Sequence, residues 1–123
     1  MGEMYFYDSY ALIEIFKGNL NYQKFGECTI YASIMNFYEV YYSILKEFNE
    51  KTAEEWKTQI DFVLVEITKE YVVEASKFRL KNIKEKLSYI DCAGYIVAKR
   101  NKLKFLTGDE KFANKENVEF VKW

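Results

Sequence analysis

Four acidic residues stand out by their positions in the chain, two of them after short apolar stretches and two of them among uncharged neighbours. Asp8 and Asp109 follow short apolar stretches, and Glu39 and Asp91 lie inside segments that carry no other charge close by. An isolated carboxylate beside a buried surface is unfavourable unless a partner compensates for its charge, and a divalent cation is one such partner. The four acids are therefore candidate metal ligands.

Each of these acids also has an ordinary structural explanation. Asp8 could cap the N-terminus of a helix, and Asp91 has the spacing to close a capping box with Ser88. Asp109 could be a first-turn acid that favours the dipole of a following helix, and Glu39 could be an exposed glutamate in the middle of a helix. No single acid decides between the two explanations.

The remaining composition narrows the chemistry that the chain can perform. It contains no histidine, which excludes Ser-His-Asp and Cys-His nucleophiles and histidine general bases. Cys28 and Cys92 lie far apart and form no CxxC motif, so we expect free thiols and neither a zinc site nor a disulfide. Carboxylates, lysines, hydroxyls and any metal ion that they hold remain for catalysis.

Basic residues concentrate in one part of the chain, although the net charge is only -1. Residues 77–104 contain two acids, Glu85 and Asp91, and the basic residues Lys77, Arg79, Lys81, Lys84, Lys86, Lys99, Arg100, Lys102 and Lys104. Such a segment could follow a phosphate backbone and attract a polyanion over a long range. A solvated, lysine-rich helix face explains the same composition equally well.

The apolar patterning predicts short strands separated by helices. Strands are expected at residues 4–7, 28–31, 61–66, 104–106 and 118–121, and helices at 9–17, 34–49, 52–59, 69–87 and 89–100. This alternation is typical of a mostly parallel sheet with helices on both faces. We therefore expect one α/β domain over residues 1–123 with four to five strands. Active sites in such sheets form at the carboxyl ends of the strands.

Nothing in the sequence indicates a membrane or export segment. The chain has no apolar run near the roughly 18 residues that a membrane-spanning helix needs. Its opening Met1-Gly2-Glu3-Met4 lacks the basic start and apolar stretch of a secretion signal. We therefore expect a cytoplasmic protein.

The order and context of the four acids resemble the PIN-domain family. The family pattern is an Asp that ends the first strand, a Glu in a central helix, an Asp that opens a late helix and a final Thr-x-Asp after a strand. The corresponding segments here are Asp8-Ser9, Asn36-Phe37-Tyr38-Glu39-Val40, Ile90-Asp91-Cys92-Ala93 and Thr107-Gly108-Asp109. The resemblance spans nearly the full chain.

This resemblance implies a metal-dependent endoribonuclease, and a VapC-type toxin of a toxin and antitoxin pair is the expected class. The four acids would be catalytic and would hold Mg²⁺ or Mn²⁺, while the hydroxyls of Ser9 and Thr107 would orient them. The expected RNA contacts are Lys99, Arg100, Lys102 and Lys104. RNA, a VapB-type antitoxin and a second copy in a homodimer are the expected partners.

Three alternatives differ from this hypothesis. The first is a PIN-type nuclease that processes RNA without an antitoxin, and the second is an inactive module that binds RNA or protein. The third is a receiver-type α/β domain with Asp8 as phosphoacceptor. Receiver domains normally need an acidic pair on an earlier strand, and no strand is expected before the one that Asp8 ends, which disfavours the third.

Overall fold

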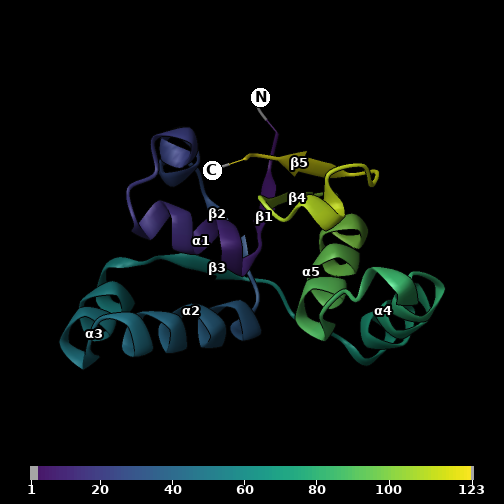
Figure 1. The fold of residues 1–123 in the computed structure, drawn as a ribbon, viewed down its shortest axis with the longest axis horizontal. Coiled ribbons are helices and arrows are strands. Elements are labelled where there is room, and N and C mark those ends of the chain that lie inside the picture. The colour runs from purple at the N-terminus through teal and green to yellow at the C-terminus, as the bar shows by residue number, and fades with distance from the viewer. Residues whose placement is uncertain (1–2, 123) are drawn as a thin grey trace.

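A five-stranded parallel sheet forms the centre of the computed structural model, which describes residues 3–122 (Figure 1). The strand order is β3-β2-β1-β4-β5, and each neighbouring pair runs parallel. The strands are β1 Tyr5–Tyr7, β2 Ile30–Ala32, β3 Phe62–Leu64, β4 Lys104–Thr107 and β5 Val118–Phe120. The predicted α/β fold with a mostly parallel sheet of four to five strands is confirmed.

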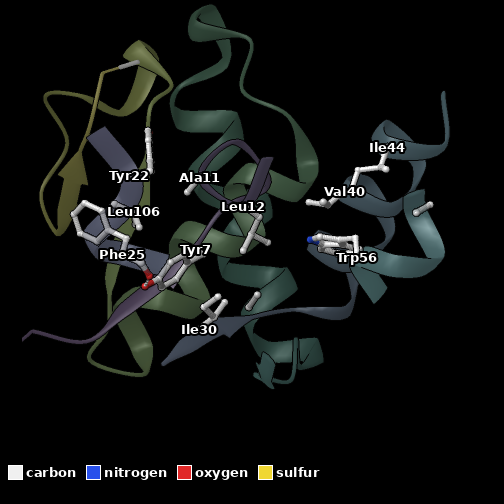
Figure 2. Close-up of a cluster of buried hydrophobic side chains, with 12 residues drawn as sticks. Tyr7, Ala11, Leu12, Tyr22, Phe25, Ile30, Val40, Ile44, Trp56 and Leu106 are labelled. Atoms are coloured by element: carbon white, nitrogen blue, oxygen red, sulfur yellow. Dashed lines mark hydrogen bonds between the residues drawn. The ribbon is translucent and has the colours of Figure 1, made fainter. Parts of the chain in front are cut away.

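Helices cover both faces of this sheet, as predicted (Figure 1). One core cluster joins the sheet to α1 Ser9–Phe16, α2 Ile34–Glu47 and α3 Glu50–Gln59, and another joins it to α4 Lys69–Lys81 and α5 Tyr89–Arg100. In β1, Tyr7 packs with Leu12 and Val40 in the first cluster (Figure 2), and Phe6 packs with Val97 in the second. The alternation follows from the two-residue side-chain period of a strand.

The close approach of α5 to the sheet depends on Gly94. A Cβ atom at this position would lie 3.0 Å from Cε1 of Phe6 and 3.2 Å from Cε1 of Phe105, which is tighter than ordinary contact. The glycine therefore lets α5 lie directly on β1 and β4. Because α5 precedes β4 and runs antiparallel to it, the first turn of α5 lies at the carboxyl ends of both strands.

Two predicted helix boundaries are wrong. The helix expected over 69–87 ends at Lys81, where the Asn82 side chain donates to Phe78 O at 2.8 Å. A short 3₁₀ helix, η2 Ile83–Glu85, follows and closes on Lys86 in the left-handed region (φ 55°). The helix expected from residue 52 begins at Glu50, because Asn49 Oδ1 accepts from the Thr52 backbone N–H at 2.8 Å and thereby caps it.

The second strand and the segment before it also differ from expectation. The strand expected at 28–31 lies at Ile30–Ala32, and a 3₁₀ helix, η1 Leu20–Glu27, precedes it where no helix was predicted. Tyr22 and Phe25 are buried in η1, and Tyr7 Oη donates to Phe25 O at 2.6 Å. The i to i+3 spacing of these two aromatics is too short a pattern to predict an element from sequence.

No helix within residues 3–122 has the length and hydrophobicity to span a bilayer.

Candidate active site

Asp8 lies at the carboxyl end of β1, beside the end of β4. Its backbone N–H donates to Leu106 O at 3.1 Å, and its carboxyl is buried, with only 2% of the residue exposed. Oδ2 accepts from Thr107 Oγ1 at 2.6 Å, and Oδ1 accepts from the Ala11 backbone N–H at 3.0 Å. Asp8 is thus the N-cap of α1, as its structural explanation proposed, and it is also bonded to the predicted orienting residue Thr107.

Glu39 is connected to the end of β1 through Ser9. Ser9 Oγ donates to Glu39 Oε1 at 2.5 Å and accepts from Asn36 Nδ2 at 3.1 Å. Asn36 is buried, and its Oδ1 accepts from the Ser33 hydroxyl at 2.7 Å and the Ser33 backbone N–H at 3.0 Å. These contacts form one continuous chain from the capping box of α2 to the Glu39 carboxylate.

Asn36 was not predicted as a site residue. The signal that could have identified it is its spacing: Asn36 precedes Glu39 by three residues and therefore shares its helix face. An amide at a position that must be buried is also unusual, because such a group needs hydrogen-bond partners inside the protein.

Asp91 lies in the first turn of α5 and is half-buried. Its backbone N–H donates to Ser88 Oγ at 3.0 Å, so Ser88 caps the helix, which is one of the two hydrogen bonds of the predicted capping box. The pKa of its carboxyl is raised to about 6, mainly by burial and also by the charges of Glu39 and Asp109, against the opposing effects of the Ser88 hydrogen bond and the Lys111 ammonium. Asp91 is therefore close enough to Glu39 and Asp109 for their charges to act on it.

Asp109 follows β4 in a tight loop. Its backbone N–H donates to Thr107 Oγ1 at 3.0 Å, and its Oδ1 accepts from the Lys111 backbone N–H at 3.0 Å. Gly108, between Thr107 and Asp109, packs so closely against Tyr10 and Tyr22 that an added Cβ would lie 2.3 Å from Cε1 of Tyr10 and 2.7 Å from Oη of Tyr22. The Thr107 hydroxyl thus joins Asp8 to the Asp109 loop, and the glycine allows that loop to lie against α1.

The electrostatics of Asp8 and Asp91 together connect the four acids. The pKa of the Asp8 carboxyl is raised from 3.8 to about 7, mainly by burial and also by the charges of Asp91 and Asp109, against the opposing effect of the hydrogen bonds from Thr107 and Ala11. The four carboxylates, which come from the end of β1, helices α2 and α5 and the loop after β4, therefore lie in one neighbourhood at the carboxyl edge of the sheet. Their mutual repulsion is the condition that a bound cation relieves.

The acids do not, however, form a closed set of ligands. Within residues 3–122, no three Asp, Glu or Cys side chains are placed so that they could hold a metal ion together. Each oxygen of Asp8 accepts one hydrogen bond, and Glu39 Oε1 accepts one from Ser9. The structure brings the predicted acids into one neighbourhood without converging them on one point.

The predicted RNA contacts lie elsewhere. Lys99 and Arg100 are at the end of α5, about 12 Å along the helix axis from Asp91, and Lys104 begins β4 at the opposite edge of the sheet. Lys99 pairs with Glu116 at 2.6 Å, Arg100 with Glu74 at 2.5 Å and Lys104 with Glu3 at 3.7 Å. Lys102 lies in the turn between α5 and β4. The structure does not bring these four residues to the acids.

A parallel α/β sheet with acids gathered at its carboxyl edge defines the class of protein. The family model for the PIN domain matches residues 5–118, and the chain belongs to the PIN domain family. No curated protein sequence matches the chain significantly.

Solved structures share the fold. VapC20 of Mycobacterium tuberculosis, described as a toxin that cleaves the sarcin-ricin loop, is 14% identical with a TM-score of 0.76 over 94% of this chain and 98% of that one. A toxin-antitoxin complex from Klebsiella pneumoniae is 18% identical (TM-score 0.69; 94% and 95% covered), and PAE2754 from Pyrobaculum aerophilum is 16% identical (TM-score 0.71; 98% and 91% covered). At these identities the likeness establishes the fold alone.

Proposed function

We propose that this protein is a metal-dependent endoribonuclease and the toxin of a VapBC-type toxin and antitoxin pair. The observation that carries the proposal is the buried Asp8 carboxyl at the end of β1, with Asp91 and Asp109 close enough to raise its pKa. A purely structural N-cap does not require further acids around it. Membership of the PIN domain family supports the same conclusion.

Asp8, Glu39, Asp91 and Asp109 would hold Mg²⁺ or Mn²⁺. All their donors are carboxylate oxygens, which suit these hard cations, and Mg²⁺ usually binds through one or two carboxylates and keeps several waters. The residues therefore fit the ion even though no three of the described side chains converge. When bound, the ion supplies positive charge at the phosphate and lowers the pKa of water at neutral pH.

The surrounding side chains would keep the acids oriented. The Thr107 hydroxyl holds Asp8 Oδ2 and also accepts from the Asp109 backbone, so one side chain aligns two acids. Ser9, itself fixed by Asn36, holds Glu39 Oε1. Hydrogen bonds behind ligand carboxylates set their orientation, and losing one typically lowers metal affinity or activity about 10- to 100-fold.

A cleavage assay with matched variants tests the proposal. RNA is incubated with Mg²⁺, Mn²⁺ or chelator, and the parent is compared with Asp8→Asn, Asp91→Asn and the exposed control Asp61→Asn. We expect cleavage only with metal, a loss of at least about 100-fold in the first two variants, and parental activity in the control. Undiminished cleavage by folded Asp8→Asn and Asp91→Asn would contradict the proposal.

The partners follow from the same proposal. A VapB-type antitoxin is proposed on the likeness to a toxin-antitoxin complex, and a neighbouring reading frame for a small DNA-binding protein would separate this function from that of a PIN nuclease without antitoxin.

A homodimer is proposed on the stripe of exposed apolar side chains along α2, namely Ile34, Tyr38, Tyr42 and Leu45. Light scattering of the parent and of Tyr38→Ala with Tyr42→Ala tests it, and a monomeric parent would contradict it.

A further inference from the structure

An exposed tyrosine at the start of α5, two residues before Asp91, stacks with an arginine of α4 that forms no ion pair within residues 3–122. Tyr89 is the first residue of the helix and is 74% exposed. The Arg79 guanidinium carbon, from the neighbouring helix α4, lies 4.1 Å from the centroid of the Tyr89 ring. Figure 1 shows α4 alongside α5, which explains how residues ten apart in sequence stack.

The position of Arg79 is fixed, but its charge is not neutralised. Its Nε donates to Leu87 O at 2.9 Å, which holds the guanidinium plane over the Tyr89 ring. Among residues 3–122, no carboxylate lies within ion-pairing distance of it. Arg100, by contrast, is engaged by both oxygens of Glu74. Arg79 therefore keeps its terminal nitrogens free for an anion.

A second cation lies at the same end of the molecule. Lys111 Nζ donates to Lys86 O at 3.3 Å and has no carboxylate partner among the described residues. Its ammonium is close enough to Asp91 to lower the pKa of that carboxyl. Unpaired cations thus flank the acids.

We propose that Tyr89 and Arg79 form a binding platform for one unpaired RNA nucleotide beside the acids, with the base stacked on the free face of Tyr89 and a phosphate on the Arg79 guanidinium. This inference rests on the proposed ribonuclease function and names the residues that hold its substrate. Single-stranded RNA is recognised through such stacking on aromatic rings, together with cationic contacts to the backbone.

A nucleotide fits this surface better than an apolar peptide does. Tyr89 and Arg79 border an apolar cavity of about 210 Å³ between α4 and α5, which an apolar side chain could also enter. Covering Arg79 with apolar groups would remove water from an unpaired charge, and that is unfavourable. A phosphate would instead neutralise the guanidinium while the base covers the ring.

RNA binding in chelator tests the platform without cleavage. The anisotropy of a short fluorescein-labelled single-stranded RNA is measured with the parent, Tyr89→Ala and Arg79→Ala. Leu20→Ala, which removes an exposed apolar side chain away from the acids, and Arg100→Ala, which removes the paired arginine, are the matched controls. Thermal melting of every variant confirms folding, and Tyr89→Phe tests whether the ring alone suffices.

We expect Tyr89→Ala to weaken binding about 5- to 100-fold, because one stacked base is lost, and Tyr89→Phe to bind like the parent. Arg79→Ala reduces the dependence of log K on log salt by about 0.7, the value for one phosphate contact on a single strand. Both controls stay within about twofold of the parent. With an abasic strand of the same length, Tyr89→Ala has no effect, whereas Arg79→Ala still weakens binding.

The platform is overturned if Tyr89→Ala and Arg79→Ala both bind RNA with the parental affinity. It is also overturned if Arg100→Ala lowers the RNA affinity as much as Arg79→Ala does. Binding of an apolar peptide that is lost in Tyr89→Ala, with RNA affinity unchanged, assigns the surface to a protein partner and overturns it too. If the parent binds RNA through Tyr89 and cleaves none with metal, the proposed hydrolysis fails and the platform stands. If the parent cleaves, Asp8→Asn does not, and Tyr89→Ala binds like the parent, only the platform fails.

Discussion

Charged side chains are paired and exposed at one end of α5 and half-buried among like charges at the other. At its end, Lys99 and Arg100 are exposed and each is paired with a glutamate. At its start, the Asp91 carboxyl is half-buried among other acids, and its pKa is raised to about 6. Exposed pairs contribute little to stability and leave no charge for a ligand, whereas unpaired charges at a buried edge destabilise the fold unless a ligand compensates them. A functional site is therefore better located by unsatisfied charge than by charge density.

The largest effect should come from Gly108→Ala at the acidic edge. The added methyl would clash with Tyr10 and Tyr22, and we expect a loss of about 1–3 kcal/mol in the free energy of unfolding, together with reduced cleavage as the Asp109 loop shifts. Gly26→Ala is the matched control, because its Cβ would meet only Ile15 Cγ2 at 3.5 Å. Chemical denaturation measures the free energy of unfolding of the two variants. Equal stabilities would show that the loop against α1 is not tightly constrained.

Thr107→Val should lower activity more than stability. The substitution keeps the shape of the side chain but removes the hydroxyl that bonds Asp8 Oδ2 and the Asp109 backbone. We expect cleavage to fall about 10- to 100-fold while the protein remains folded. Thr58→Val, at an exposed threonine that bonds only Glu55 O, should leave the rate unchanged. A parental rate for Thr107→Val would mean that Asp8 needs no such support.

The pH dependence of stability in chelator distinguishes the two ends further. Burial raises the folded-state pKa of Asp8 to about 7 and of Asp91 to about 6, above the ordinary 3.8, so the folded state binds protons more tightly than the unfolded state. Their stabilising contribution is complete below the unfolded value and is lost as pH rises through about 6 to 7. The melting temperature should therefore fall between about pH 4 and 7.

Asp8→Asn provides the control for this pH effect. The variant lacks the buried titrating group, so its melting temperature should change less over the same range, and added Mg²⁺ should stabilise the parent more at pH 8 than at pH 5. Calorimetry or fluorescence measures both effects. A parental melting temperature that is constant or rises with pH would contradict the raised pKa values.

The smallest effect is expected at the other end of α5. Arg100→Ala removes an exposed pair with Glu74, and we expect a change of about 0.2–1 kcal/mol in unfolding free energy, with cleavage unaffected. Urea denaturation and the RNA cleavage assay measure these two quantities. A large loss of cleavage in this variant would erase the contrast between the two ends and restore Arg100 as the RNA contact expected from sequence.

Local signals in the sequence were sufficient for most of the fold. The helical spacing in α5 and the strand-like stretches at β1 and β4 predicted those elements nearly to the residue. Errors arose where side-chain contacts to distant residues decide the structure. η1 exists because Tyr22 and Phe25 are buried against β1 and the last strand region, with Tyr22 Oη donating to Val121 O at 2.5 Å. Such contacts leave no periodic pattern in the chain.

The candidate site also has some features that the sequence determines and others that only the tertiary structure determines. The sequence by itself determined that Glu39 and Asp91 are isolated from other charges and that Asp8 and Asp109 follow strands, because these are properties of neighbouring residues. Only the tertiary structure decided that Thr107 would hold Asp8 across 99 positions, that Asn36 would support Glu39 through Ser9, and that Arg79 would keep a free charge. Pairing between distant side chains depends on how helices pack on the sheet, and a charge count along the chain contains no information about that packing.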